Sequence, residues 1–447
     1  MNTQRPVGVH RLNTTKAKEL IHEKRHENLM EKILERENLK EALLRVERNK
    51  GAPGVDNVTV KSLRNYIQDR WAGIKIKLLN GTYKPLPVRR VEISKPNGGT
   101  RLLGIPTVLD RLIQQAIAQV LTAIYDPTFS HYSYGFRPER SAHQAVKQAQ
   151  AYIQQGFTHV VDMDIEKFFD KVNHNILMEK LAKNIADKAL MKLIRRYLQA
   201  GVMINGCWNA SEEGTPQGGP LSPLLANIML HELDIELENR GHRFVRYADD
   251  FNIYVKSNRA GMRVMDSVKR FVGKRLKLKV NEEKSAVDRP WNRKMLGFSF
   301  TNEEQTRIRM APQTIKRFRE KMRQLTGRLA GESMQVRLIR INTYLKGWIG
   351  YFALVQTRFR INELDGWIRR RLRACLLKQW RKPKTKLRNL ISLGLDSKWA
   401  GRISGSRKMC WRLSLSPQVS KALGCAYWRE QGLVGLAERY DVLRNAL

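Results

Sequence analysis

Two neighbouring carboxylates interrupt a strand-like stretch of the sequence, Phe244–Ser257 (FVRYADDFNIYVKS). Apolar and polar residues alternate on both sides of Asp249 and Asp250, so the stretch predicts a hairpin that bends at Ala248–Asp250. Asp is common in turns, which is the simpler explanation. Tight hairpins, however, favour Asn-Gly or Asp-Gly, and adjacent carboxylates repel each other. The doublet therefore needs a second reason.

A second acidic strand is predicted at residues 158–165, within HVVDMDIEKFFDKVNH. Strand alternation directs Val161, Met163 and Ile165 to one face, and Asp162 and Asp164 to the other. If this strand lies beside the hairpin, Asp164 and Asp249 converge together with Asp250. Such a set of carboxylates can hold two magnesium ions about 3.5–4 Å apart for phosphoryl transfer. Solvent-facing carboxylates at a sheet edge would explain either element alone, but less well both together.

The composition indicates a polyanionic partner. The 447 residues include 82 Lys and Arg against 42 Asp and Glu, a net charge of +40, which exceeds what solubility requires. Residues 301–447 carry 32 basic and 10 acidic side chains, and so more than half of that excess. With 42% hydrophobic residues the chain can still bury a large core.

Cysteine usage and hydropathy bear on the compartment. Four cysteines lack metal-binding spacing, so no structural zinc is expected, and a reducing, cytoplasmic compartment fits them best. No run of 18 apolar residues occurs, which argues against a membrane partner. The basic N-terminus leaves an organellar transit peptide as an alternative.

The order of elements predicts an α+β part followed by an all-α part. Residues 18–50 read as helical and stop at Gly51. A strand at Val91–Ser94, a helix from Thr107–Asp110, one or two helices at 175–200 and a helix from Pro223 surround the acidic strands. Beyond Phe300 the chain turns helical and basic to about Lys382, where Pro383 breaks it.

Five blocks resemble, in order and spacing, those of reverse transcriptases encoded in bacterial group II introns: SKPNGGTRLLGIPTVLDRLIQQAI (94–117), YGFRP (134–138), DMDIEKFFD (162–170), TPQGGPLSPLLANIML (215–230) and YADD (247–250). RENLKEALLRVERNKGAPGVD, from Arg36, is similar to the extra N-terminal block of these enzymes. The segment 345–373 is similar to their thumb or maturase domain. The likeness runs from about Glu37 to the C-terminus.

The resemblance implies a right-hand polymerase: fingers and an antiparallel-sheet palm, followed by an all-α thumb. The expected domains are a helical N-terminal extension (1–50), fingers (51–157), palm (158–305), thumb or maturase domain (306–390) and a short basic nucleic-acid-binding segment (391–447). The implied reaction is RNA-directed DNA synthesis with two magnesium ions as cofactor. The implied partners are the intron RNA, a DNA target and primer, and deoxynucleoside triphosphates.

The resemblance also implies roles for individual residues. Asp164, Asp249 and Asp250 are similar to the catalytic metal ligands, with Asp162 as the alternative to Asp164. Phe168 or Phe169 resembles the gate that excludes a ribose 2′-hydroxyl. The remaining expected contacts are Lys95 and Arg101 to the triphosphate, Gln217, Gly218 and Gly219 to nucleotide and template, Tyr247 to the primer, and Lys284 as proton donor to pyrophosphate. A solvated lysine is the alternative for Lys284.

A basic run should meet structured RNA. From Gly366 to Leu395 there are ten basic residues and no acidic one. An apolar stripe at helical spacing, formed by Ile368, Leu372, Cys375 and Leu376, predicts that one side of this helix packs. The expected RNA contacts on the other side are Arg369, Arg370, Arg371, Arg373 and Lys378. A solvated charged face is the alternative.

Two rival functions are a retron or phage-defence reverse transcriptase and a splicing-only maturase. The thumb block argues against the first, and the intact YADD motif argues against the second. The nine histidines stop at His242, and no later cysteines have metal-binding spacing. We therefore expect no HNH nuclease in this chain, so that it must borrow a DNA 3′ end rather than nick its own target.

Overall fold

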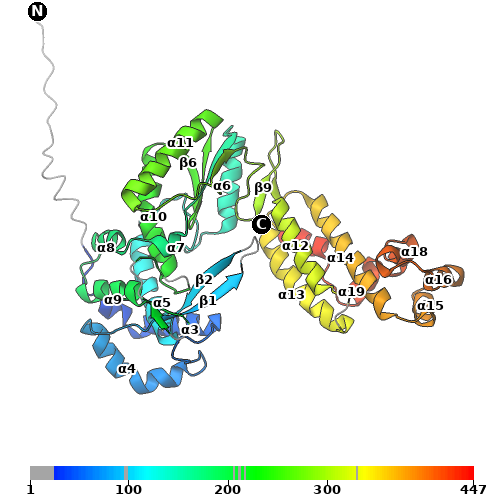
Figure 1. Cartoon of the computed structure of the whole chain (residues 1–447), viewed down its shortest axis with the longest axis horizontal. Helices are drawn as coiled ribbons and strands as arrows, with labels where there is room; N and C mark the ends of the chain where they lie inside the picture. The colour runs from blue at the N-terminus through cyan, green and yellow to red at the C-terminus, as the bar shows by residue number, and fades with distance from the viewer. Residues whose placement is uncertain are drawn as a thin grey trace, which may run out of the picture. The chain divides into compact units, whose positions relative to one another are not determined.

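The computed structural model describes residues 25–94, 99–204, 207–209, 213–215, 218–328 and 331–446. These residues fall into two compact units. One unit comprises the chain up to Ala145 together with Val161–Val287, and the other comprises Val146–Val160 together with the chain from Asp288 onward. Figure 1 shows the elements of both units.

The first unit is built from helices around two sheets. Its helices are α2 (Leu29–Ile33), α3 (Arg36–Asn49), α4 (Leu63–Leu79), α5 (Val108–Tyr125), α7 (Phe168–Lys171), α8 (His174–Ala182), α9 (Lys188–Gln199), α10 (Ser222–Asn239) and α11 (Asn258–Phe271), with a 3₁₀ turn η1 (Asp126–Thr128) and a π-helical turn η2 (Val272–Leu276). The predicted start at Thr107 is confirmed, because its hydroxyl accepts from the Asp110 amide and caps α5.

One sheet of this unit has the order β2-β1-β4-β5. Its strands are β1 (Val88–Ser94), β2 (Thr100–Ile105), β4 (Val202–Ile204) and β5 (Cys207–Asn209). β1 and β2 form an antiparallel hairpin in which Ser94 pairs with Thr100. The predicted strand at Val91–Ser94 is confirmed as part of β1.

The other sheet carries both acidic motifs and has the order β6-β7-β3-β8. Its strands are β3 (His159–Asp164), β6 (Arg243–Tyr247), β7 (Asp250–Val255) and β8 (Ala286–Asp288). The two acidic strands, β3 and β7, are neighbours, as expected. The predicted alternation in β3 is also confirmed, because Val161, Met163 and Ile165 are buried and Asp164 is not.

A single hydrophobic core joins the N-terminal helices to this sheet. It runs from Leu29 on α2 through α5, α8, α9 and α10 to the sheet residues Phe244 and Phe251, and ends at Val280. Burying apolar surface is the main favourable term in folding. Helices α2 and α5 and the acidic sheet therefore stabilise one another through this shared core.

The second unit consists mainly of helices. It contains the hairpin β9 (Phe298–Phe300) and β10 (Ile308–Met310), and most of α6 (Ala142–Gln154), whose Gln150 amide donates to the Thr306 carbonyl at 2.7 Å. The helices that follow are α12 (Pro312–Leu325), α13 (Met334–Phe352), α14 (Arg358–Gln379), α15 (Pro383–Ser392), α16 (Ser397–Ser404), α17 (Cys410–Leu413), α18 (Pro417–Ala422), α19 (Cys425–Glu430) and α20 (Leu436–Arg444).

Pro383 lies between two helices of this unit: it follows the end of α14 and begins α15. α14 ends at Gln379, as the proline predicts, but Pro383 is also the first residue of α15. Proline suits that position because its fixed φ is helical and the first amides of a helix have no partner. No helix among the described residues is long and apolar enough to span a membrane.

Candidate active site

The acidic doublet lies at a tight turn between β6 and β7. Tyr247 pairs with Asp250 across the hairpin, which leaves Ala248 and Asp249 as the two turn residues. Ala248 has a φ of 58°, in the left-handed region that favours glycine. An alanine there costs about 1 kcal/mol or more, so the surrounding structure must hold it.

A buried guanidinium supports this turn from behind. Arg246 is fully buried and donates two hydrogen bonds to the Asp234 carboxylate of α10, at 2.7 and 2.6 Å. It also donates to the Asn227 side-chain oxygen and to the Ala248 carbonyl, each at 2.9 Å. The Arg246 network, formed by Arg246, Asp234 and Asn227, therefore links helix α10 to the backbone of the acidic turn.

Asp164 ends the neighbouring strand and faces a cation. Its amide donates to the Ser285 hydroxyl at 3.1 Å, and its carbonyl accepts from the Asn281 amide at 2.8 Å. The Lys284 ammonium lies 3.1 Å from an Asp164 carboxylate oxygen. Lys284 is therefore ion-paired in this structure, although its side chain is 64% exposed.

The structure places Asp164 at the end of β3, Asp249 in the β6–β7 turn and Asp250 at the start of β7. Asp164 is half-buried, Asp249 is half-buried and Asp250 is exposed. In the part of the chain that the structure describes, no three His, Cys, Asp or Glu side chains are arranged to hold a metal ion. The joint role of these aspartates as metal ligands stays a prediction. Asp162, the alternative to Asp164, lies on the same strand face.

The two candidate gate residues differ in burial. Phe168 is 2% exposed and Phe169 is 8% exposed, and their rings meet edge to face at 5.2 Å. The Phe169 carbonyl accepts from the Thr215 amide at 2.6 Å, which ties α7 to the loop before α10. Both rings thus belong to the hydrophobic core, Phe169 slightly less deeply, and the backbone of Phe169 contacts the segment that the resemblance assigns to the nucleotide.

Part of the predicted nucleotide contact set lies outside the described residues. Lys95 and Gln217 are among these, and of Arg101 only the backbone, in β2, is described. Gly218 is described, with a φ of 127°, and a Cβ there would lie 2.6 Å from the Gly104 carbonyl oxygen. The loop therefore needs glycine at this position to pass so close to β2.

Comparison with known proteins identifies the family. The model of "Reverse transcriptase (RNA-dependent DNA polymerase)" matches residues 93–300, and that of "Group II intron, maturase-specific domain" matches residues 315–391. Protein YkfC of Escherichia coli is 34% identical over 303 residues, which cover 59% of this chain and 80% of YkfC. The chain belongs to the group II intron reverse transcriptase and maturase family.

Other relatives agree with this assignment. The group II intron-encoded protein LtrA of Lactococcus lactis is 33% identical over 309 residues, which cover 54% of this chain and 50% of LtrA. By these sequence matches the chain is an RNA-directed DNA polymerase, and reverse transcriptases in general depend on a divalent metal ion. A solved "Partial Cas6-RT-Cas1--Cas2 complex" contains a chain 29% identical to this one, with a TM-score of 0.36, over 55% of this chain and 42% of that one.

The maturase-specific part shows how the predicted basic helix α14 packs. The predicted apolar stripe of α14 is buried: Ile368, Leu372, Cys375 and Leu376 are each at most 8% exposed. Arg373, however, is also buried and donates to the Ser414 carbonyl at 2.9 Å. Burial, with Arg369 and Arg370 nearby, lowers the pKa of Arg373 to about 10. Arg373 is therefore largely enclosed by the protein, and its contact with RNA stays a prediction.

The other three arginines that were predicted to contact RNA are half-buried and make contacts within the protein. Arg369 pairs with Asp365, and Arg370 lies over the Trp411 ring, 3.9 Å from its centroid. Arg371 donates to the hydroxyl and carbonyl oxygens of Thr326. Lys378, at the end of α14, is exposed. Within α14, Arg370 and Arg371 therefore contact segments outside the helix, whereas the exposed cations of the run begin at Lys378.

The residues that sequence reasoning missed are buried polar groups. Arg246 and Asp234 carry no motif: Arg246 follows Phe244 and Val245 in β6, and Asp234 stands between Leu233 and Ile235 in α10. Asp110 is a second case, since it is 1% exposed and accepts from the hydroxyls of Tyr83, Thr107 and Tyr197 at 2.8–3.2 Å. Burial raises the pKa of Asp110. The available signal is a charged residue at a position where the helix or strand period requires an apolar one.

Proposed function

We propose that this protein copies RNA into DNA at Asp164, Asp249 and Asp250, and that its maturase-specific domain binds the parent intron RNA to promote splicing and mobility. One observation supports the catalytic assignment above the others. Two acidic elements 85 residues apart in sequence meet within the reverse transcriptase match: Asp164 ends β3, and the Asp249–Asp250 pair lies where the turn enters the neighbouring strand β7. Carboxylates so placed need cations nearby to offset their repulsion.

The donor set of this site fits magnesium. Carboxylate oxygens are the ligands that Mg²⁺ prefers, and the Lys284 ammonium 3.1 Å from Asp164 shows that a cation is accommodated beside this strand end. Asp164, Asp249 and Asp250 would hold two magnesium ions. When bound, magnesium stabilises the charge that develops on the attacking and leaving oxygens.

The protein's own residues would position the substrates around these carboxylates. Phe169 is the better candidate for the sugar gate, because Phe168 is fully enclosed by the core. A rigid ring against the sugar excludes a 2′-hydroxyl by its volume. Tyr247, at the end of β6, would support the primer end. Lys284, once separated from Asp164, could donate its proton to the leaving pyrophosphate.

The triphosphate and template contacts follow the glycine-rich segments. Lys95 and Arg101 would offset the charge of the triphosphate, and Gln217 would contact the base pair being formed. Gly218 lets the backbone of the same loop approach the template, because no side chain intervenes.

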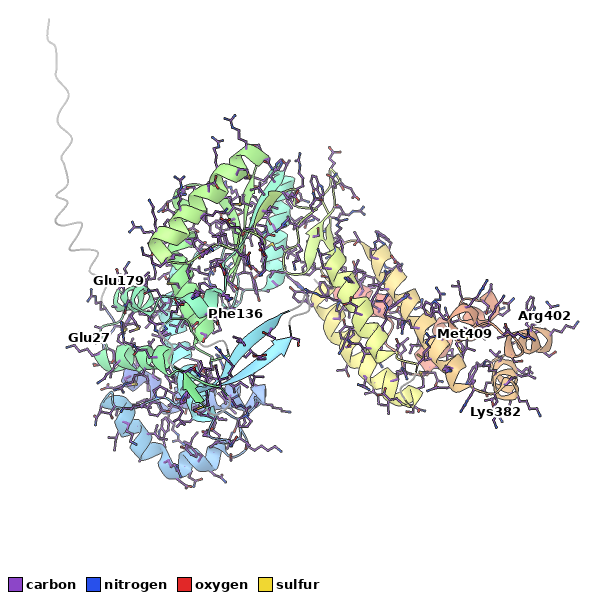
Figure 2. All side chains as sticks on the ribbon, in the orientation of Figure 1. Glu27, Phe136, Glu179, Lys382, Arg402 and Met409 are labelled. Carbon is purple, nitrogen blue, oxygen red and sulfur yellow. The ribbon has the colours of Figure 1, made fainter. Side chains whose placement is uncertain are left out.

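The RNA contacts of the maturase part are assigned to exposed cations. We define the α15 basic face as Lys382, Lys384 and Arg388, all exposed. Lys382 is labelled in Figure 2, together with Arg402 of the next helix, whose guanidinium lies 5.2 Å from the ring centroid of Trp399. We assign the RNA contacts to these exposed cations and Lys378, with the exposed ring of Trp399 as a stacking partner, since cations and aromatic rings together suit structured RNA.

Primer extension on an RNA template tests the proposal directly. Asp249→Asn keeps the shape of the side chain but removes the charge that holds magnesium, so we expect no detectable extension, with intron RNA binding nearly unchanged. Asp266→Asn, an exposed aspartate on α11, is the matched control and should extend normally. Near wild-type extension by Asp249→Asn in magnesium would overturn the assignment.

A further inference from the structure

Phe136 is an exposed aromatic side chain in an unfavourable backbone conformation. It is 57% exposed and has a φ of 58°, within the YGFRP block before α6 (Figure 2). A phenylalanine gains stability from burial, and a side chain with a Cβ disfavours the left-handed region. Neither property of Phe136 helps the fold, and strain of this kind often accompanies a functional position.

The backbone on both sides of Phe136 is held firmly. A Cβ on Gly135 would lie 2.4 Å from the Ala248 amide nitrogen, so the loop passes directly against the acidic turn. The Gly135 carbonyl accepts from the Asn227 side chain at 2.9 Å. On the other side, the Arg137 guanidinium donates to four oxygens at 2.6–2.9 Å: the carboxylate and carbonyl oxygens of Asp126 and the carbonyl oxygens of Ser130 and Ser133. Phe136 is therefore presented by a rigid loop.

This loop extends the acidic sheet at its outer strand. The Tyr134 amide donates to the Arg246 carbonyl, and the Arg246 amide donates to the Tyr132 carbonyl, each at 2.9 Å. The Phe136 and Tyr247 rings consequently lie near each other, with centroids 6.2 Å apart and planes inclined at 47°. Two aromatic rings thus stand together on the β6 side of the acidic turn.

The proposed nucleotide site lies on the other side of the turn. β7 separates β6 from β3, and Phe169 follows β3. In a polymerase the incoming nucleotide and the primer's 3′-hydroxyl must approach the carboxylates from different directions. Because Phe169 is assigned to the nucleotide, the β6 side remains for the primer.

We infer that Phe136 and Tyr247 together form a stacking site for the sugar and base of the primer's 3′-terminal nucleotide. The inference rests on the proposed function and adds a specific substrate contact to it. Aromatic rings bind nucleotides of any sequence, since every base has an apolar face. A primer site must accept any terminal base, which suits an aromatic contact better than a hydrogen-bonding one. The rigid loop around Phe136 reduces the entropy that is lost on binding.

Primer–template affinity without nucleotides is the decisive measurement. Fluorescence anisotropy with a labelled DNA primer on an RNA template should show Phe136→Ala binding about 5- to 150-fold more weakly, the range expected when one stacking interaction is removed. Phe136→Trp should restore most of the affinity. A primer that ends in an abasic sugar should reduce the difference between Phe136→Ala and the wild type, because the base that stacks is gone.

Stability measurements separate this role from a structural one. Phe136→Gly removes the backbone strain, so its melting temperature should equal or exceed that of the wild type while its primer affinity falls. Ile76→Ala, on α4, is the control for loss of an exposed apolar side chain, since Ile76 is 59% exposed. It should bind primer normally.

Two outcomes would overturn the inference. One is wild-type primer affinity for Phe136→Ala, and the other is a loss of affinity that persists unchanged with the abasic primer. Failure of the proposed function is recognised separately. In that case the wild-type protein itself would not extend primers, whatever the effect of Phe136.

Discussion

Removing either member of the buried Arg246–Asp234 pair should strongly destabilise the protein. Both side chains are at most 1% exposed, so Arg246→Met leaves a carboxylate, and Asp234→Leu a guanidinium, without its counter-charge in the core. Breaking a buried pair in this way costs about 3–5 kcal/mol. For a unit of this size the expected fall in melting temperature is about 6–20 °C.

The double variant Arg246→Met with Asp234→Leu separates stability from positioning. Apolar side chains in place of both charges often leave stability near that of the original pair, so we expect most of the lost stability to return. The Ala248 carbonyl, however, still lacks its charged hydrogen bond, which is worth about 1.5–3 kcal/mol. If this bond holds Asp249 in place, the rate of nucleotide addition stays about 10- to 150-fold below wild type.

Two assays decide the outcome. Thermal unfolding gives the stability of the wild type, both single variants and the double variant, and single-turnover primer extension gives the rate at a temperature where all are folded. Lys180→Met serves as the control, since it breaks the ion pair with Glu232 between α8 and α10. It should lose some stability without slowing the reaction. A double variant with a wild-type rate would refute the positioning role of Arg246.

Three further predictions follow from individual side chains. Phe169→Ala should raise ribonucleotide incorporation, whereas Phe168→Ala should mainly lower the melting temperature; equal discrimination in both variants would place the gate elsewhere. Neutralising the α15 basic face should lower the log–log salt slope of intron RNA binding by about 0.7–0.9 for each phosphate that the protein no longer neutralises, and an unchanged slope would mark that face as merely solvated. Burial lowers the pKa of His174, so the unfolded chain takes up the proton first and stability should fall as the pH drops below about 6.5. His174→Gln should show a smaller loss between pH 7 and 5.5 by thermal unfolding, and an equal loss would contradict this cause.

Periodicity predicted those parts of the fold in which one face of an element is buried. The alternation around Met163 in β3 and the apolar stripe around Leu372 in α14 are both found, because burial follows the strand and helix periods. The hairpin was predicted as well, with its bend placed at Ala248–Asp250. The turn residues are Ala248 and Asp249, and Asp250 already opens β7.

What the sequence did not disclose depends on partners that are distant along the chain. In β6, Arg246 lies two residues after Phe244 and therefore points to the same buried face. Its carboxylate partner, Asp234, lies on helix α10, and the strand pattern does not show which helix supplies that partner. Similarly, the helical period of α14 shows which residues share a face with the apolar stripe, but it does not show which other segments cover the opposite face. Arg373 is buried because the chain around Ser414, 41 residues later, covers it.

Two of the non-glycine residues with positive φ values lie in the candidate site, away from helix ends. Lys50 and Lys277 also have positive φ values, but each is the C-cap of a helix or helical turn, where such values are common. Ala248 and Phe136, in contrast, lie in the acidic turn and in the loop against it.

The hydrogen bonds that offset this strain come from one network. Arg246 holds the Ala248 carbonyl, and Asn227, which Arg246 also contacts, holds the Gly135 carbonyl beside Phe136. Single substitutions in the network should therefore change stability and activity together, because the same bonds secure both the turn and the loop. The Phe136 ring, which contributes little buried surface, should affect substrate binding alone. This difference arises because the buried polar groups of the network contribute to the free energy of unfolding, whereas the exposed Phe136 ring contributes little to it.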